Sequence, residues 1–139
     1  MNRRGLGRGR LLASIGALAT LASIPLTWWR VGGSPGIPES SGNGLSGAGI
    51  VIILAAVFLL ALVVLPFAGA DRPQPLDRPL SFVVIAALAF VGLGAVVFQL
   101  FDLGALGLPE RSPGLWLGGA GVLLMCWGTW EIVAEPGRR

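Results

Sequence analysis

Four stretches of this chain contain no charged residue, and this pattern constrains the fold more than any other feature of the sequence. The charge-free stretches cover residues 11–29, 40–70, 79–101 and 112–130, and all seventeen formal charges lie outside them. A bilayer core of about 30 Å needs about 20 apolar residues in a helix, and a charge at its centre costs roughly 2.5–3.5 kcal/mol. The pattern therefore predicts an all-α fold, a four-helix transmembrane bundle that forms one integral membrane domain over residues 1–139.

The helix boundaries follow from the charges and from the positions of proline and serine. We expect helices over about residues 11–29, 47–68, 80–102 and 113–133. Ser112 is a suitable N-cap for the last of these, and Pro113 suits its first turn. Pro25 lies inside the first and frees a backbone carbonyl, so a kink or a loosened last turn is expected there. Loop 30–46 is rich in Gly, Pro and Ser, which is typical of turns.

The arginines predict the orientation in the membrane. Eight of the ten lie before the first predicted helix, between the second and third, or at the end of the chain, namely Arg3, Arg4, Arg8, Arg10, Arg72, Arg78, Arg138 and Arg139. Only Arg30 and Arg111 fall in the other two loops. The positive-inside rule then places both termini and loop 71–79 in the cytoplasm of a multi-pass protein of the cell (plasma) membrane.

Membrane orientation explains why the basic residues lie where they do, so we expect no nucleic-acid partner. Binding of lipid headgroups by the arginines over residues 3–10 is the alternative. The chain has no Lys and is rich in Ala and Gly, a composition that indicates a GC-rich bacterial genome.

The two halves of the chain, residues 11–70 and 80–139, resemble each other. The repeated segments are 15–19 with 85–89, 36–39 with 107–110, and 47–50 with 119–122. Each half holds two predicted helices, so the halves share one orientation, which predicts two similar helical hairpins in a parallel internal duplication. Chance similarity in a chain rich in Gly, Ala and Leu is the alternative. Under the duplication Arg30 takes the place of Asp102, and these opposite charges would be able to pair across the pseudo-twofold axis.

The chain offers few groups for catalysis or cofactor binding. It has no histidine and one cysteine, Cys126, which excludes an internal disulfide and a cysteine-based metal cluster and removes the usual haem, zinc and copper ligand. No nucleophile–base pair or metal-ligand set is recognisable. We therefore expect no enzyme activity, no cofactor and no metal.

Gln99 and Asp102 are polar residues at the end of the third predicted helix, and their spacing of three puts them on one face. The same face continues with Ala86, Ala89, Gly92 and Ala95. A stripe of small residues that ends in two polar groups is typical of a helix-packing seam with an interfacial cap. The alternative is a polar vestibule for an ion or a small solute.

Gly114 and Gly118 form a Gly-x-x-x-Gly motif in the fourth predicted helix, and Gly121 extends it. This spacing permits close contact with another helix, which we expect within the monomer rather than in a homodimer or a partner complex. A similar but weaker face on the first predicted helix contains Gly16 and Thr20.

Tryptophans lie near the ends of the predicted helices, where indole rings prefer the level of the lipid headgroups. The expected interfacial anchors are Trp28, Trp29, Trp116, Trp127 and Trp130.

These features favour a non-catalytic function. We expect an accessory or structural subunit of a membrane protein complex, with membrane lipids and other membrane subunits, or a second copy of the chain, as partners. The alternative is a small-solute or ion transporter or channel that acts as a homo-oligomer, in which Gln99 and Asp102 begin the polar path.

Overall fold

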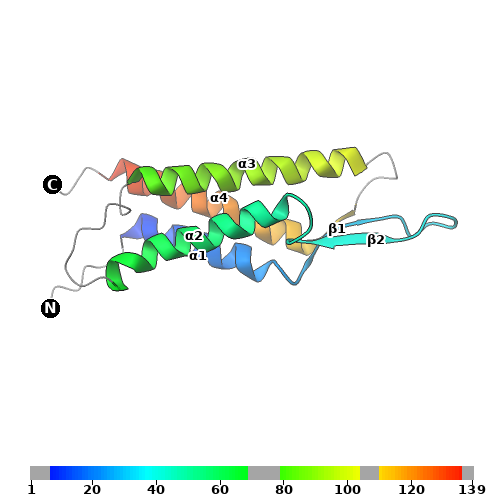
Figure 1. The fold of residues 1–139 in the computed structure, drawn as a ribbon, viewed down its shortest axis with the longest axis horizontal. Coiled ribbons are helices and arrows are strands. Elements are labelled where there is room, and N and C mark those ends of the chain that lie inside the picture. Colours follow the sequence, from blue (N-terminus) through cyan, green and yellow to red (C-terminus); the bar gives the residue numbers. More distant parts are fainter. Residues whose placement is uncertain (1–6, 69–78, 104–109, 136–139) are drawn as a thin grey trace.

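A computed structural model describes residues 7–68, 79–103 and 110–135, and in these ranges the chain forms four helices and a small sheet (Figure 1). The helices are α1 (Arg8–Ala22), α2 (Gly49–Ala68), α3 (Pro79–Leu103) and α4 (Pro113–Ala134). The strands are β1 (Thr27–Val31), β2 (Ser40–Asn43) and β3 (Glu110–Arg111). All three strands lie at one end of the bundle, called the sheet end here, and α1 begins and α4 finishes at the opposite, terminal end.

Three of the helices are long and apolar enough to cross a membrane. The candidate spans are Gly49–Pro66, Pro79–Asp102 and Pro113–Ala134. These helices match the predicted boundaries to within two residues. α3 and α4 begin at Pro79 and Pro113, and α3 ends one residue after Asp102. Ser112 takes the N-cap position of α4 without a side-chain hydrogen bond. A multi-pass membrane protein is therefore supported.

The first helix is shorter than predicted, because α1 ends at Ala22 rather than continuing to residue 29. Its 15 residues extend about 22 Å at the helical rise of 1.5 Å per residue, which is less than a bilayer core. Pro25 has no backbone N–H and disfavours helical backbone at the residue before it. The helix closes with the Ser23 N–H donating to Ala19 O over 3.1 Å, and β1 uses the residues that follow.

The sheet corrects the all-α prediction. Its strand order is β2-β1-β3, and both pairings are antiparallel. β1 has the sequence Thr-Trp-Trp-Arg-Val, whose aromatic and β-branched residues favour a strand over a helix end. Trp29 lies opposite Gly42 in β2, and Arg30 lies opposite Glu110 in β3. The sheet therefore joins the loop before α2 to the loop before α4, and the β1–β2 hairpin projects beyond the helices (Figure 1).

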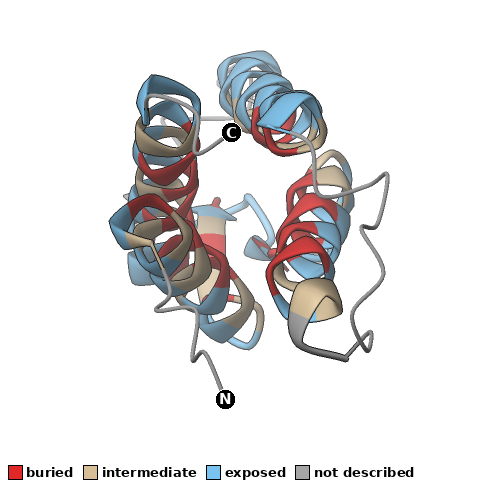
Figure 2. Cartoon of the chain, turned by 90° about the vertical axis from the view of Figure 1, so that its left-hand side faces the viewer, coloured by how far each residue is buried: buried red, intermediate tan, exposed pale blue. Residues whose placement is uncertain are grey.

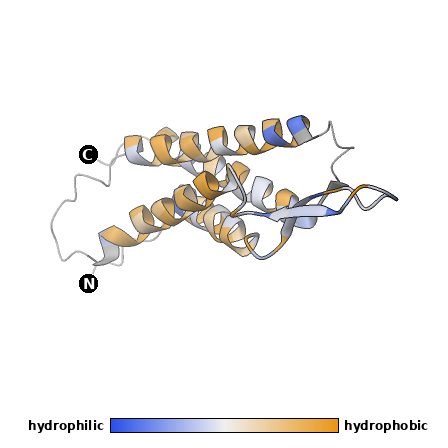
Figure 3. Ribbon diagram, turned by 45° about the vertical axis from the view of Figure 1, so that its right-hand side comes forward, coloured by the Kyte–Doolittle hydropathy of each residue, from blue (hydrophilic) through white to orange (hydrophobic). Residues whose placement is uncertain are grey.

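The helices pack in the ring order α1–α2–α3–α4, with α4 returning to α1. Their buried faces point inward and their exposed faces point outward, as Figure 2 shows. The core contains the fully buried side chains of Ile52, Leu59, Phe82, Val122 and Met125. The outward faces are also strongly hydrophobic along most of their length (Figure 3), which is the arrangement that lipid permits.

The predicted duplication requires this ring order, since a twofold axis would exchange α1 with α3 and α2 with α4. The lengths of the exchanged helices differ, however, with 15 residues in α1 and 25 in α3. Residues 71–78 of the loop between α2 and α3, and residues 107–109 of segment 107–110, lie outside the described residues. The internal duplication stays a prediction.

Candidate functional site

Glycines bring α1 and α4 into backbone contact. A Cβ atom added at Gly9 would lie 2.7 Å from Gly128 O, and one added at Gly16 would lie 2.5 Å from Gly121 O. The two pairs run in opposite directions along the helices, so α1 and α4 are antiparallel. We call Gly9, Gly16, Gly121 and Gly128 the glycine seam. Any larger residue at these positions would force the helices apart.

Hydroxyl groups beside the seam are bonded to the backbone. Thr20 Oγ1 donates to Gly16 O over 2.9 Å and lies 3.9 Å from Met125 Sδ on α4. Ser23 Oγ donates to Thr20 O over 2.6 Å. Both side chains are fully buried, so these bonds remove the cost of placing a hydroxyl in the core.

Trp28 fills a groove that Gly114 and Gly118 leave on α4. Its indole is 1% exposed, and Cβ atoms added at the two glycines would lie 2.6 Å and 2.7 Å from its ring. The indole Nε1–H donates to Ser23 O over 3.1 Å, which satisfies a carbonyl at the end of α1. The Ser112 N–H in turn donates to Trp28 O over 3.4 Å, so β1 is tied to the start of α4.

The position of Trp28 corrects its predicted role as an interfacial anchor. The chain turns after Ala22, and this turn directs the indole into the protein rather than toward lipid headgroups. Gly114 and Gly118, predicted as a helix–helix contact, instead receive this strand residue. The sequence shows one large residue, Trp28, and two small ones, Gly114 and Gly118. It does not show that the indole packs against these glycines, because that contact depends on the end of α1 at Ala22.

The other tryptophans have more exposed positions. Trp29 is half-buried, with its ring against Gly42 of the neighbouring strand. Trp116, Trp127 and Trp130 are 63%, 64% and 73% exposed. All three project from the outward face of α4, one near the sheet end and two near the terminal end, and their anchoring role stays a prediction.

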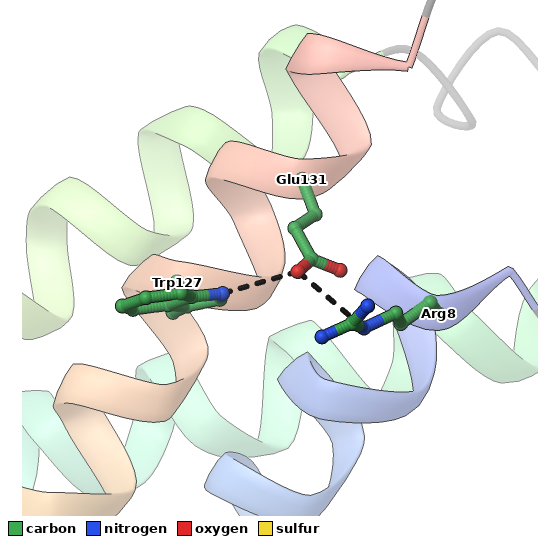
Figure 4. A network of polar contacts seen from close by, with 3 residues as sticks. All are labelled: Arg8, Trp127 and Glu131. Atoms are coloured by element: carbon green, nitrogen blue, oxygen red, sulfur yellow. Dashed lines mark hydrogen bonds and ion pairs between the residues drawn. The ribbon is translucent and has the colours of Figure 1, made fainter.

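A polar cluster ties α1 to α4 at the terminal end (Figure 4). Glu131 accepts a hydrogen bond from Trp127 Nε1–H over 3.1 Å, and the same carboxylate oxygen lies 3.6 Å from Arg8 Nε. Arg10 lies over the ring of Phe82 on α3, with its guanidinium carbon 5.8 Å from the ring centroid. The Arg8 side chain is 81% exposed, so its pairing with Glu131 contributes at most about 1 kcal/mol.

Gln99, Asp102 and Arg30 all lie at the sheet end, and no hydrogen bond or ion pair joins any two of these three described residues. Gln99 Oε1 accepts from the Ala48 N–H over 3.5 Å and so caps the start of α2. Asp102 is exposed at the end of α3. Arg30 pairs with Glu39 over 3.0 Å, in place of the predicted partner Asp102. The transport alternative, which needs a path from Gln99 and Asp102, stays a prediction.

Few polar side chains are buried in the described part of the bundle. They are Thr20, Ser23, Ser112 and Thr129. Thr129 Oγ1 is the buried side-chain oxygen without a hydrogen-bond partner among the described residues. Within the same ranges, no group of three or more potential metal ligands occurs.

Two glycines of the seam carry no recognisable signal in the sequence. Gly9 precedes the predicted first helix, and Gly128 has no glycine four positions away, so neither belonged to a recognisable motif. Comparison with known protein families matches no family model, and comparison with curated proteins finds no match.

Proposed function

We propose that this protein is a non-catalytic accessory or structural subunit of a membrane protein complex. The observation that carries the proposal is the way the bundle is closed. The glycine seam brings α1 and α4 together, and apolar side chains of all four helices fill the interior. The bulky side chains that remain accessible face outward, which suits contact with lipids and with other membrane proteins.

The proposal includes an orientation in the cell membrane. The terminal end, with Arg8, Arg10 and Glu131, would lie at the cytoplasmic surface, and the sheet would lie outside. All four helices would be embedded, with α1 reaching less far through the bilayer because the chain turns at Ser23 and continues as β1. Non-helical backbone at membrane depth is tolerated where protein covers it, and Trp28 and the start of α4 provide that cover.

Site-specific photo-cross-linking in native membranes tests the proposal. A photoreactive residue at Phe98, which is 71% exposed on α3, should give one reproducible heavier species that contains a second protein. The matched position is Ala89 on the same helix, which is fully buried and should yield contacts within the chain. Lipid adducts alone at Phe98 and at exposed positions on the other helices, with a monomer at native abundance, would contradict the proposal.

A further inference from the structure

A shallow basin opens at the sheet end, between the turn after α1, the β1–β2 hairpin and the segment that leads into α2. Its volume is about 230 Å³, and it is lined by Pro25, Thr27, Ser41, Gly42, Asn43 and Ser46. It stands apart from the glycine seam and from the terminal-end cluster. In the proposed orientation it lies at the outer surface of the membrane.

The side chains that line the basin carry no charge, and four of the six lining residues have a side chain that can form hydrogen bonds. Thr27, Ser41 and Ser46 contribute hydroxyls, and Asn43 contributes an amide. Asn43 Oδ1 accepts from the Leu45 N–H over 3.1 Å and from Ser46 Oγ over 3.3 Å. Ser46 Oγ also accepts from the Asn43 N–H over 3.2 Å, so its proton and one acceptor position are used within the turn. The Asn43 NH₂ group and the hydroxyls of Thr27 and Ser41 are therefore the lining groups that can serve a ligand, and these two hydroxyls both donate and accept.

The surroundings disfavour an anionic ligand. The start of α2 would attract an anion if its amides were open, but the Ala48 N–H donates to Gln99 Oε1 and the Gly49 N–H donates to Ser46 O. Arg30, the nearest cation along β1, is paired with Glu39. A phosphate in the basin would therefore gain no counter-charge from these groups.

Apolar side chains flank the basin in the sequence. Leu26 precedes Thr27, and Leu45 precedes Ser46; both leucines are exposed, by 37% and 50%. Ile50, at the start of α2, is 47% exposed. A ligand with a hydroxylated head and an apolar tail would suit this combination of a polar basin and exposed apolar residues close to it in the sequence.

We propose that the basin binds an uncharged polyhydroxyl group, such as a sugar, and that the sugar headgroup of an outer-leaflet glycolipid supplies it. The hydroxyls of Thr27 and Ser41 and the Asn43 NH₂ group bind the sugar, and the exposed leucines contact the acyl chains. This inference rests on the membrane orientation proposed above and does not depend on the accessory-subunit role.

Hydrogen–deuterium exchange of the protein in phosphatidylcholine nanodiscs tests the proposal. Addition of monoglucosyl diacylglycerol to the nanodisc should slow exchange of the backbone amides over residues 41–46 by about tenfold at roughly ten times the dissociation constant. The double variant Thr27→Val with Ser41→Ala should lose this protection. The matched control is Ser40→Ala, since Ser40 is exposed on the same strand but does not line the basin.

The possible results separate the sources of the ligand. Protection by both soluble methyl glucoside and the glycolipid supports a sugar site that a glycolipid headgroup occupies. Protection by methyl glucoside alone would contradict the glycolipid and indicate a free sugar as the ligand. Equal protection by phosphatidylglycerol would overturn the proposal, because an interfacial effect would then explain it. Protection that survives in the double variant, or no protection with any probe, would also overturn it. Unchanged unfolding midpoints of the variants confirm that the fold is intact.

Discussion

Gly16→Ala in α1 is the most informative perturbation of the glycine seam. The added Cβ would lie 2.5 Å from Gly121 O and 2.6 Å from Met125 N, both of them backbone atoms of α4. Backbone atoms in the middle of a helix cannot rotate away as a side chain can. The variant can therefore be accommodated only if α1 and α4 move apart.

The size of the effect follows from these distances. Carbon contacts are optimal near 3.5–4.0 Å, so the helices must separate locally by about 1 Å, which forfeits roughly a quarter to a half of each dispersion contact along the seam. Overpacking of this kind costs about 1–3 kcal/mol. Alanine also favours the helix over glycine by about 0.5–1 kcal/mol, and this gain has to be separated from the loss.

Gly94→Ala on α3 separates the gain in helix propensity from the cost of overpacking, because an added Cβ there meets no atom within 4 Å. Both variants gain the same helix propensity, so their difference in free energy of unfolding reports the seam alone. We expect Gly16→Ala to be less stable than Gly94→Ala by about 1–3 kcal/mol. Reversible unfolding in mixed micelles, followed by circular dichroism, measures this difference. Equal stability of the two variants would refute the close backbone contact.

Other contacts give further predictions, each measured by the same unfolding assay. Trp28→Ala should lose about 3–5 kcal/mol, because it empties the groove on α4; a loss below that of an exposed tryptophan would contradict the buried position. Thr129→Val should be neutral or stabilising by up to about 1–3 kcal/mol, since it removes a buried hydroxyl without a partner; a clear loss would indicate a hydrogen bond. Arg8→Ala should change stability by about 1 kcal/mol or less, because its ion pair with Glu131 is largely exposed; a larger loss would show that the terminal-end cluster holds the helices together.

The sequence predicted the helices where local signals determine their ends. α3 and α4 begin at Pro79 and Pro113, α3 ends one residue after Asp102, and α2 ends three residues before Asp71 in the sequence. Two signals oppose each other at the end of α1, since Pro25 favours an early end and the apolar run favours a helix that continues to Trp29. Hydropathy does not distinguish these outcomes, because the same apolar residues suit a membrane helix and a buried strand.

The sheet and the seam could not be read from the sequence because they depend on distant partners. β1 pairs with β3 across about 80 intervening residues, and neither segment shows the alternation of a surface strand. Gly121 was recognised as a packing residue, but its partner Gly16 lies on the first helix and was one of several small residues there. Spacing identifies a face that permits close approach, whereas the three-dimensional arrangement determines which helix fills it.

Labelling of introduced cysteines in intact cells tests the membrane orientation most directly. In a Cys126→Ala background, Ser41→Cys marks the sheet end and Glu135→Cys marks the terminal end. A membrane-impermeant maleimide should label Ser41→Cys in intact cells and should label Glu135→Cys only after the cells are permeabilised. Labelling of both positions from the same side of the membrane would contradict a bundle that crosses the bilayer between its two ends.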